Sequence, residues 1–506
     1  MSLGTILIRA DASAAIGTGH VMRCLALAQA WEAAGGRVAF AMSEGTDAVQ
    51  SRLLVEGCDV LPVSAPSGTT NDLRQTIALV KERNCDWAVV DGYQFGAEYQ
   101  RGLKAENIKT LFLDDCGHAQ RYFADFVLNQ NVSATRALYT DRDPNTQLLL
   151  GTRYCLLRRE FSSWREWRRR VSPGGRRVLV TMGGSDPENL SSRLIDSLSV
   201  VPVDDLEVLV VMGGSSSAAL RLEELPESPG KKVRVLRDVN NIGELMAWAD
   251  VAISSAGSTC WELCLLGLPS LLIDVAENQK PIAKELNRRG CAIHLGGAHE
   301  FNDAQLATQL EQLLRSPEAR QAMSIRCREL VDGRGVLRVL SAMRSKLYVR
   351  RVRPNDEQLL WKWANDPHVR AAAFSQAEIS WQEHRIWFAG KIDNPNCLLL
   401  IAEDEAGCAI GQFRVDWISD QDGEIDVSVS SERRGAGYGR ALIEIGVSRA
   451  FAERGERLHA FVKAENEASR RAFEYAGFTK LGHETTRGRQ STHYVCHKDS
   501  AGIWSE

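Results

Sequence analysis

Long apolar runs are missing from this sequence. No stretch reaches the roughly 18 residues that cross a membrane, and a strand-like segment follows the first residues without a secretory leader. We therefore expect a soluble, cytoplasmic protein with no membrane partner. Basic runs are missing too, because 61 Lys and Arg stand against 65 Asp and Glu and the net charge is −4. This balance disfavours nucleic acid or an anionic lipid surface as a partner.

Cys-x-x-Cys pairs are absent among the 12 cysteines. The most closely spaced pair, Cys260 and Cys264, lies one helical turn apart among apolar neighbours. This usage favours reduced, buried thiols over a disulfide or a structural metal, and we expect no metal cofactor. The chain of 506 residues is too long for one ordinary core, so two to four domains are expected.

A glycine-bearing loop near the start of the chain is the first candidate site. It joins the apolar strand Thr5–Ile8 to a segment with apolar residues at helical spacing. Gly17 and Gly19 have no Cβ and let the backbone approach a ligand, and a helix start is a natural seat for phosphate. His20 suits proton transfer near neutral pH. A histidine that only caps or packs is the alternative.

Residues 1–165 alternate strand and helix patterns. Strands are predicted at 5–8, 38–42, 87–91, 110–115 and 126–131, which is typical of a parallel sheet with helices on both faces. Ligands of such sheets bind beyond the carboxyl ends of the strands. The polar residues predicted at that edge are Asp11, His20, Asp91, Tyr93, Asp114 and Asp115. For each acid, a cap or a loop contact is the alternative.

Residues 175–345 are predicted to form a second unit of the same kind. After strands at 177–181, 206–212 and 233–236, the segment 249–262 runs from a strand through a small-residue turn into a helix. Such a turn brings backbone amides to a diphosphate, and the nearby Glu262 can accept two ribose hydroxyls. Asn278 and Gln279 offer donors and acceptors to sugar or base. The alternative is that Ser258 or Thr259 caps the helix with Glu262 as its partner.

These motifs together resemble the UDP-sugar hydrolases of pseudaminic acid biosynthesis, which remove UDP from 2,4-diacetamido-2,4,6-trideoxy-β-L-altrose. The resemblance covers residues 1–345. The matching motifs are Arg9-x-Asp11, Gly17-Thr-Gly-His-Val-Met-Arg23, Asp91-x-Tyr93, Asp114-Asp115, Gly183-Gly-Ser-Asp186, Gly257-Ser-Thr259, Glu262 and Asn278-Gln279. That family is similar in turn to the two-domain glycosyltransferases that build lipid-linked peptidoglycan precursors.

The resemblance implies two Rossmann-like domains in a GT-B-type arrangement, with UDP held mainly by the second and with no metal. It makes His20 the group that activates or positions water at the anomeric carbon, with Tyr93 helping to orient the water. Asp11 either fixes the histidine tautomer or binds sugar. The residues expected to bind the UDP-sugar are Gly17, Gly19, Arg23, Asp91, Gly183, Gly184, Gly257, Ser258, Thr259, Glu262, Asn278 and Gln279.

Residues 348–500 follow a different pattern. Strands at 398–402, 409–415 and 424–429 are joined by polar turns. The small residues of the next loop, 433–442, are flanked by arginines and can present consecutive N–H groups to a pyrophosphate. The antiparallel look of the strands argues against a dinucleotide fingerprint. A second helix, ending in a glycine, is predicted after Asn466.

This last part resembles the GNAT acetyltransferases, an α+β family, over residues 348–498. The resemblance implies that the turn from Arg434 to Gly439 binds the pyrophosphate of acetyl-CoA. The residues expected to bind acetyl-CoA are Val427, Arg434, Gly435, Gly437, Tyr438, Gly439, Arg440, Asn466 and Ser469. The segment Trp363–Arg370 and the pair His384-x-x-Trp387 look like the branch that N-acetylates a UDP-4-amino sugar of the same pathway.

One departure from the GNAT pattern concerns the general acid. Many members carry a tyrosine where this chain has Phe473, and Tyr475 stands two residues away on another helix face. Tyr438 or solvent is the alternative acid. A backbone N–H near Val427 is expected to polarise the thioester, with Asp426 or Glu424 as the base, acting directly or through water.

The sequence therefore predicts a bifunctional enzyme. Its last domain acetylates the 4-amino group of a UDP-6-deoxy-amino sugar with acetyl-CoA, and its first two domains hydrolyse the product to UDP and free sugar. Three alternatives remain: a glycosyltransferase on the same scaffold, an acetyltransferase with another amine acceptor, and a sugar-nucleotide-binding regulator. The sequence does not determine the oligomeric state.

Overall fold

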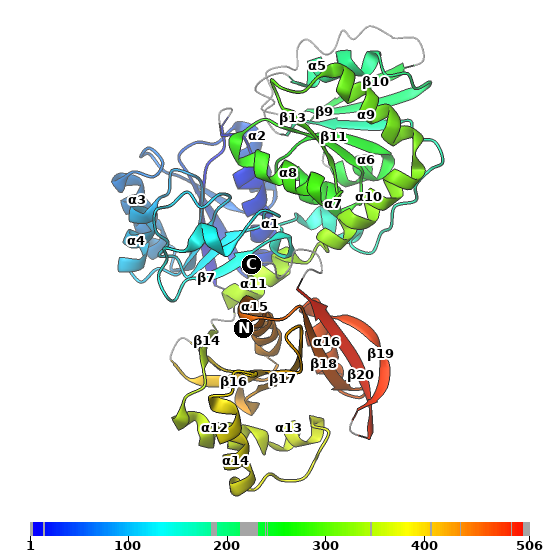
Figure 1. The fold of residues 1–506 in the computed structure, drawn as a ribbon. Helices are drawn as coiled ribbons and strands as arrows, with labels where there is room; N and C mark the ends of the chain where they lie inside the picture. Colours follow the sequence, from blue (N-terminus) through cyan, green and yellow to red (C-terminus); the bar gives the residue numbers. More distant parts are fainter. Residues whose placement is uncertain are drawn as a thin grey trace. The chain divides into compact units, whose positions relative to one another are not determined.

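The computed structural model describes residues 4–13, 16–183, 190–212, 231–237, 239, 241–344, 347–404, 407–435, 437–486 and 488–498. The chain divides into two compact units, Met1–Leu340 and Ser341–Glu506 (Figure 1). No helix in these described ranges is long and apolar enough to cross a membrane.

The first unit opens with a seven-stranded parallel sheet of order β3-β2-β1-β4-β5-β6-β7. Its strands are β1 (Thr5–Ala10), β2 (Arg37–Met42), β3 (Asp59–Pro62), β4 (Cys85–Asp91), β5 (Thr110–Leu113), β6 (Phe126–Asn129) and β7 (Gln147–Leu150). Its helices are α1 (Gly19–Ala33), α2 (Asp47–Val55), α3 (Thr70–Glu82) and α4 (Ala97–Ala105). Every residue of β1 is buried, because helices cover both faces of the sheet.

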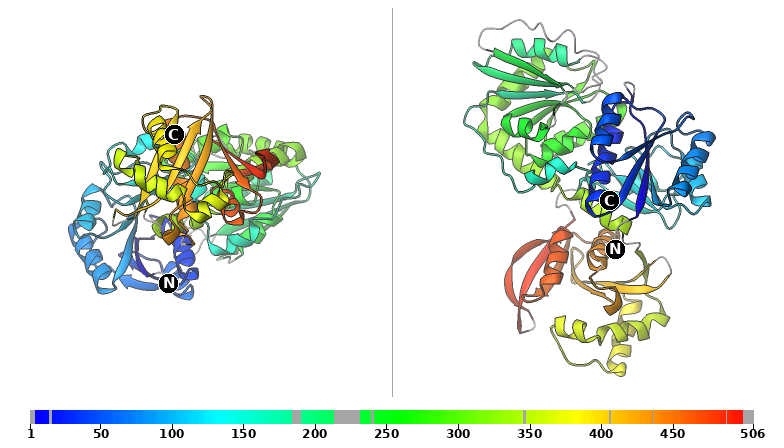
Figure 2. Two further views of the ribbon diagram at one scale, coloured as in Figure 1. Left: turned by 90° about the horizontal axis from the view of Figure 1, so that it is seen from below. Right: turned by 180° about the vertical axis from the view of Figure 1, so that it is seen from behind.

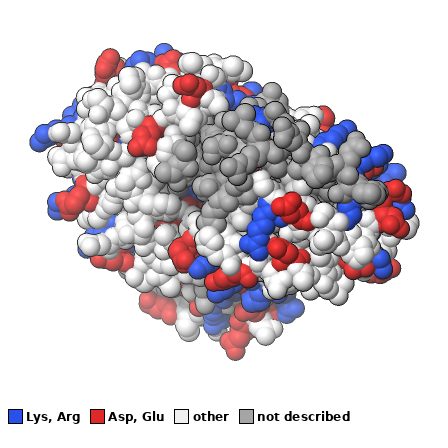
Figure 3. All heavy atoms as spheres, turned by 90° about the horizontal axis from the view of Figure 1, so that it is seen from above, with Lys and Arg blue, Asp and Glu red and all other residues white. Residues whose placement is uncertain are grey.

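The second sheet of this unit is also parallel and has the order β10-β9-β8-β11-β12-β13. Its strands are β8 (Arg177–Thr181), β9 (Leu206–Met212), β10 (Lys231–Arg237), β11 (Val251–Ser255), β12 (Ser270–Asp274) and β13 (Ile293–Gly297). Its helices are α5 (Leu190–Ser199), α6 (Ile242–Trp248), α7 (Thr259–Leu265), α8 (Lys280–Arg288), α9 (Asp303–Arg315) and α10 (Pro317–Leu330), and α11 (Gly335–Arg344) follows. On the face drawn in Figure 3, basic and acidic side chains are intermixed, as the near-balanced composition leads one to expect.

In each sheet the strand order reverses at one point, and the loops at these two points carry the candidate site. The strand order reverses between β1 and β4 in the first sheet and between β8 and β11 in the second. Loops that leave neighbouring strands there turn to opposite faces, so a crevice opens at the carboxyl ends. The loops after β1, β4 and β11 are those that the sequence singled out.

Four strands of the first unit were missed in the sequence. These are β3, β7, β12 and β13, all of them at or beside an edge of a sheet. Strand β3 is half exposed and ends in Pro62, and β7 follows a turn-rich segment. Edge strands bury one face at most, so they lack the continuous apolar run of central strands.

The second unit is built on a seven-stranded mixed sheet of order β14-β15-β16-β17-β18-β20-β19. Its strands are β14 (Tyr348–Arg351), β15 (Cys397–Glu403), β16 (Ala409–Trp417), β17 (Asp422–Val429), β18 (Arg457–Lys463), β19 (Thr479–Thr486) and β20 (Arg489–His497). Its helices are α12 (Glu357–Ala364), α13 (Pro367–Ala372), α14 (Trp381–Ile392), α15 (Tyr438–Glu453) and α16 (Glu467–Tyr475). The last three strands, β18 to β20, were not predicted.

The two central strands of this sheet separate along their length. Strands β17 and β18 pair in parallel only from Asp422 with Arg457 to Glu424 with His459. Beyond that pair, β17 continues to Val429 and β18 to Lys463 without pairing to each other. Figures 1 and 2 show β18, β20 and β19 turning away from β16 and β17. We call this separation of the main chains of β17 and β18, beyond the pair of Glu424 and His459, the opening.

Alternating side chains divide this sheet between two cores. Leu398, Phe413 and Leu458 belong to the core that includes α15 and α16, whereas Leu399 packs with Leu360 and Phe388 of α12 and α14. Helix α15 lies so close to β16 that a Cβ on Gly446 would come within 2.4 Å of the ring of Phe413. Only glycine fits at this crossing.

The close contact at Gly446 gives a stability test. Gly446→Ala is expected to lower the free energy of unfolding of the second unit by about 1–3 kcal/mol, because the Phe413 ring is fully buried and must shift. The matched control is Gly390→Ala in α14, where a Cβ meets nothing within 4 Å and helix propensity alone favours alanine. Calorimetric unfolding of both variants checks this. Equal stability of the two would contradict the packing argument.

Candidate functional site

The loop between β1 and α1 brings backbone and histidine to the carboxyl edge of the first sheet. Gly17 has a φ of 79°, a left-handed conformation that favours glycine. Helix α1 begins at Gly19, and His20 is its second residue. A Cβ on Gly19 would lie 3.9 Å from Oγ of Ser258, so this loop faces the turn after β11 in the second sheet. Two segments predicted to bind one ligand thus lie side by side.

His20 is held by a buried carboxylate. Its Nδ1 lies 2.6 Å from Oδ1 of Asp91, which is fully buried at the end of β4. Burial favours the neutral acid, but the charges of Arg23 and His20 outweigh it and keep the pKa of Asp91 well below its ordinary value. An ionised Asp91 makes Nδ1 the protonated nitrogen, which leaves Nε2 to accept a proton.

Arg23 completes the support of this pair. Its Nε and Nη2 donate to both oxygens of Asp91 at 2.7 Å, and its Nη1 donates to Asp115 at 2.7 Å. Such a bidentate, buried pair fixes the carboxylate in one orientation. Arg23 and Asp91 were predicted to bind the UDP-sugar. In this structure their polar atoms contact each other, Asp115 and His20, which is a positioning arrangement.

Tyr93 stands between the histidine and the second sheet. Its ring is edge-on to His20 at 5.2 Å, its hydroxyl donates to Asp115 at 2.8 Å, and it accepts from Nδ2 of Asn278 at 2.7 Å. Burial and the negative charge of Asp115 raise the pKa of Tyr93 above its ordinary value. The hydroxyl therefore stays protonated and serves as a hydrogen-bond donor, not as a base.

Asp11 has a different environment from the one expected of a partner of His20. Its oxygens accept from Arg9 Nη1 at 2.7 Å, from the Ser43 backbone at 2.7 Å and from the Ser67 hydroxyl at 2.6 Å. The prediction that Asp11 could fix the tautomer of His20 is therefore wrong, because Asp91 occupies Nδ1. Binding of sugar by Asp11 stays a prediction.

The turn after β11 carries the residues predicted for UDP. Ser258 is the N-cap position of α7, yet no side-chain capping hydrogen bond is formed there, so the capping interpretation of this segment is not supported. Gly257 would place a Cβ 3.6 Å from Gln279, whose Oε1 accepts from the backbone of Val275. Thr259 begins α7. Gly183 ends the described part of the loop after β8, and Gly184 lies outside the described residues.

Glu262 is paired across the two sheets of the first unit. Its Oε1 accepts from Nη2 of Arg158 at 2.9 Å, and burial raises its pKa above the ordinary value. Sequence reasoning missed Arg158, which lies between β7 and β8 in a segment with no recognisable motif. Its guanidinium offsets the charge of the Glu262 carboxylate, and binding of ribose hydroxyls by Glu262 stays a prediction.

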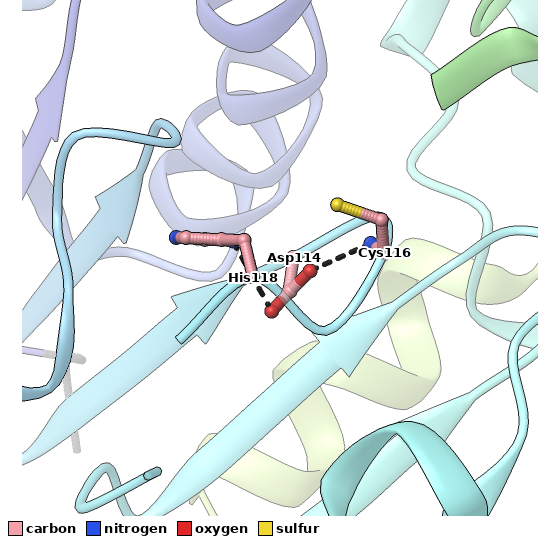
Figure 4. Close-up of side chains that lie close together, drawn as sticks. All are labelled: Asp114, Cys116 and His118. Carbon is pink, nitrogen blue, oxygen red and sulfur yellow. Dashed lines mark hydrogen bonds and ion pairs between the residues drawn. The ribbon is translucent and has the colours of Figure 1, made fainter. Parts of the chain in front are cut away.

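A compact loop follows Asp114 (Figure 4). One ligand-type atom each of Asp114, Cys116 and His118 lies within 4.8 Å of the others. The Asp114 oxygens accept from the Cys116 backbone, from the Gly117 backbone and from the Tyr122 hydroxyl, and His118 Nδ1 lies at 3.4 Å. These hydrogen bonds hold the loop in place beside Asp115.

In the second unit, the separating strands place Asp426 and Val427 beside the opening. Asp426 accepts from Gln412 at 2.9 Å and from Arg414 at 3.2 Å, so its two oxygens are engaged. Val427 follows on the part of β17 that no longer pairs with β18. Its backbone therefore lies where a thioester would be held by main-chain donors.

The glycine loop before α15, predicted to hold a pyrophosphate, contains two glycines in the left-handed conformation. Gly435 and Gly437 have φ values of 78° and 87°, and a Cβ on either would meet nothing within 4 Å. Gly437 is the N-cap position and forms no side-chain cap. Tyr438 and Gly439 then begin the helix, so their amides face outward from its start. Ala436 lies outside the described residues.

Two arginines flank this cradle. Arg434 donates from Nη2 to Asp366 at 2.7 Å and from Nε to the carbonyl of Val429 at 3.0 Å. Arg440 pairs with Glu444 at 3.1 Å and lies 5.5 Å from the ring of Tyr475.

The second helix predicted for acetyl-CoA binding begins with an amide cap. The Asn466 side chain accepts from the Ser469 backbone at 3.1 Å and so caps α16. Phe473 is buried in the core, whereas Tyr475 is 44% exposed on another face. Solvent reaches Tyr475, and its role as the general acid stays a prediction, with Tyr438 as the alternative.

Two family models match parts of the chain. Residues 177–332 match the Glycosyltransferase family 28 C-terminal domain, and residues 346–479 match the Acetyltransferase (GNAT) domain. The crystal structure of MurG of Acinetobacter baumannii covers 67% of this chain and 99% of that chain, with 15% identity and a TM-score of 0.48.

Two relatives extend the comparison to the first sheet. The uncharacterized protein MJ1062 of Methanocaldococcus jannaschii is 24% identical over 498 residues, which are 96% of this chain and 98% of that protein. The UDP-2,4-diacetamido-2,4,6-trideoxy-beta-L-altropyranose hydrolase of Campylobacter jejuni is 26% identical over 289 residues, which are 56% of this chain and 97% of the hydrolase.

The chain is therefore an enzyme of the α/β class in which a glycosyltransferase-like part is fused to a GNAT acetyltransferase domain. More particularly, its first part is a homologue of the UDP-sugar hydrolase. Both predicted resemblances are confirmed, as is the fold of two GT-B-type Rossmann-like domains followed by an α+β domain. The domain limits 1–165, 175–345 and 348–500 stay predictions, although each sheet lies within one of them.

The buried Asp91 gives a stability prediction. Asp91→Asn removes one of the two carboxylates that pair with the buried Arg23 and leaves Asp115 as the other, so it is expected to lower the free energy of unfolding at pH 7 by about 3 kcal/mol. Because the folded pKa of Asp91 is depressed, the parent's advantage is complete above the unfolded value of about 3.9 and shrinks by about 1.4 kcal/mol per pH unit below it. Denaturant unfolding of both proteins between pH 3 and 7 measures the difference. A difference that does not change with pH would contradict the assignment.

Proposed function

We propose that the first unit hydrolyses a UDP-2,4-diacetamido-2,4,6-trideoxy-β-L-altrose type of substrate to UDP and free sugar. The observation that carries this proposal is the pair of His20 and Asp91, which leaves Nε2 of His20 to accept a proton; the preceding residue, Gly19, faces the turn of Ser258. The homologous hydrolase of Campylobacter jejuni, whose name states this reaction, supports the choice of substrate class.

In this proposal His20 Nε2 removes a proton from water as the oxygen attacks the anomeric carbon. The bond from that carbon to the β-phosphate oxygen breaks, and UDP leaves as the anion. Asp91 stabilises the imidazolium that forms and does not take the proton, since its own pKa is depressed. Tyr93 donates its one hydroxyl proton to Asp115, so it would orient water or sugar through its hydroxyl oxygen, as a hydrogen-bond acceptor.

The nucleotide is assigned to the second sheet. The turn of Gly257 and Ser258 would hold the diphosphate through backbone amides, and Glu262 would accept ribose hydroxyls. The amide of Asn278 already reaches Tyr93, so a nucleotide bound here lies beside the proposed base. A site with this layout places the leaving group and the water-activating group on different sheets of one unit.

The second unit is proposed to transfer an acetyl group from acetyl-CoA to the 4-amino group of the UDP-sugar precursor. The loop of Arg434 to Gly439 would hold the pyrophosphate, with Arg440, Asn466 and Ser469 at its sides. The opening between β17 and β18 would take the thioester against the backbone near Val427. The two reactions then follow each other, because acetylation makes the diacetamido sugar that hydrolysis releases.

A glycosyltransferase is the second candidate function for the first unit. The match of residues 177–332 to the Glycosyltransferase family 28 C-terminal domain favours it. The two candidates differ in one observable, since a hydrolase releases UDP without any acceptor and a transferase needs one.

The hydrolase proposal is tested by UDP release from the diacetamido UDP-sugar without added acceptor or metal. His20→Ala is expected to lower kcat by about 10²–10⁴-fold, the usual contribution of a general base. Asp91→Asn is expected to lower it too, because the asparagine amide favours the wrong tautomer. The matched control is His483→Ala, an exposed histidine on β19 of the second unit, which should behave like the parent. Release of UDP only after an acceptor is supplied would favour the transferase.

The acetyl-CoA site is tested with Arg434→Ala. Loss of the guanidinium is expected to raise the KM for acetyl-CoA about tenfold with a small change in kcat, because a phosphate contact is equally strong in the ground state and the transition state. The control is Arg449→Ala, in helix α15, because the side chain of Arg449 pairs with Glu453. Release of free CoA thiol with the 4-amino UDP-sugar as acceptor is measured. An unchanged KM in Arg434→Ala would remove this residue from the site.

A further inference from the structure

Three side chains form a hydrogen-bonded row where β17 and β18 separate. Asp422 Oδ1 lies 3.0 Å from Nε2 of His459, and Nδ1 of His459 lies 3.0 Å from Nε2 of His493. Both histidine side chains are 19% exposed. A carboxylate followed by two imidazoles is an arrangement that can hold and move a proton.

The row lies on the face of the sheet that α13 covers. Along β18, Leu458, Ala460 and Val462 belong to the core with α15 and α16. His459 and Lys463 alternate with them, and Nζ of Lys463 donates to the carbonyl of Ala371 in α13 at 2.7 Å. On this face the acceptor can approach a thioester held in the opening, because the other face is filled by the core.

Asp422 lies in the first pair that joins β17 to β18, and His459 lies in the last. Glu424 and His459 are that pair, and the opening starts directly beyond them. His493 lies on β20 opposite Phe461, and the two rings stack at 4.5 Å. Stacking and the bond to His459 fix the orientation of the His493 ring.

Asp422 sets the tautomers of both rings. Hydrogen bonds from Arg457 and His459 lower the pKa of Asp422, so it is an ionised acceptor. His459 therefore carries its proton on Nε2, and its Nδ1 accepts from Nε2 of His493. The nitrogen left to bind a proton is Nδ1 of His493.

The charges around His493 suit a proton acceptor. Glu484 on β19 approaches Nδ1 at 3.8 Å, Glu424 and Arg457 flank the row on β17 and β18, and His483 is the neighbouring titratable group on β19. Burial lowers the pKa of His493, so the ring is neutral at neutral pH. By contrast, the oxygens of Asp426 are held by Gln412 and Arg414.

We propose that the row of Asp422, His459 and His493 accepts the proton that the amine loses during acetyl transfer. This rests on the acetyltransferase function proposed above. The ammonium of the acceptor gives one proton to Nδ1 of His493, directly or through water. Its nitrogen then attacks the thioester carbon, the N–C bond forms and the C–S bond breaks. The second amine proton leaves with the CoA thiolate as the free thiol, so protons and charge balance.

The test compares His493→Gln, Asp422→Asn and the control His483→Gln in the full chain. Acetylation of the 4-amino UDP-sugar is followed by CoA thiol release between pH 6 and 9. His493→Gln is expected to lower kcat/KM about 10²-fold with an unchanged KM for acetyl-CoA. Asp422→Asn removes the charge that stabilises the protonated row, so the rising limb of the pH profile moves to lower pH with a reduced plateau. His483→Gln is expected to match the parent.

A parent-like pH profile and rate in His493→Gln would overturn the proposal. If the parent and His483→Gln bind acetyl-CoA but do not acetylate this sugar, the proposed acceptor is wrong. The row is then tested by measuring which ring nitrogens of His459 and His493 carry protons. Nitrogen NMR of ¹⁵N-histidine-labelled chain is expected to show His459 protonated on Nε2 and His493 protonated on Nε2, with the two rings sharing uptake of one proton. The opposite tautomers, or two independent titrations, would overturn the inference without reference to any acceptor.

Discussion

The first unit depends on one buried charge. The carboxylate of Asp91 has no contact with solvent and is stable there only because Arg23 grips both its oxygens. This same carboxylate orients His20, and Arg23 passes the constraint on to Asp115, which in turn holds Tyr93. Removal of any member leaves a charge or a donor unpaired inside the protein, so the site is either assembled as a whole or lost. The hydrogen bonds that keep the charge of Asp91 buried therefore also hold the ring of His20 in one orientation.

The same topological feature, a reversal of strand order, occurs in both parallel sheets and brings the residues of the candidate site together. In each parallel sheet the strand order reverses once, and the loops at that point carry glycines and small residues instead of bulky side chains. One sheet contributes the histidine, and the other contributes the turn and carboxylate suited to a nucleotide. A Cβ at Gly19 would lie 3.9 Å from Oγ of Ser258, an ordinary van der Waals distance, so the two loops face each other closely. The proposed hydrolysis would therefore use residues of both sheets, which neither strand pattern alone reveals.

The second unit presents backbone donors to a ligand in a different way from the first. Its sheet is interrupted, not closed, and the interruption exposes backbone donors along β17 while the glycine loop exposes those at the start of α15. Side chains then line the two sides of the opening according to strand alternation, apolar toward α15 and titratable toward α13. The relative MJ1062, which matches almost all of both chains, shows that the fusion of these two parts is not peculiar to this chain. Consecutive reactions on one sugar nucleotide give such a fusion a chemical logic.

The sequence by itself determined the fold class, the central strands and most of the loops that carry the candidate sites, because buried strands and glycine turns leave strong local patterns. It did not supply β3, β7, β12, β13 or the last three strands; β3 and β7 are short edge strands with half-exposed residues, which leave a weak local pattern. Nor could it choose between Asp11 and Asp91 as the partner of His20, since both follow a buried strand and only the order of β1 and β4 in the sheet decides which carboxylate faces the helix. Arg158 with Glu262, and His459 with His493, are likewise pairs that are distant in sequence. Pairing across space depends on strand register and on packing, and these exist only once the chain has folded.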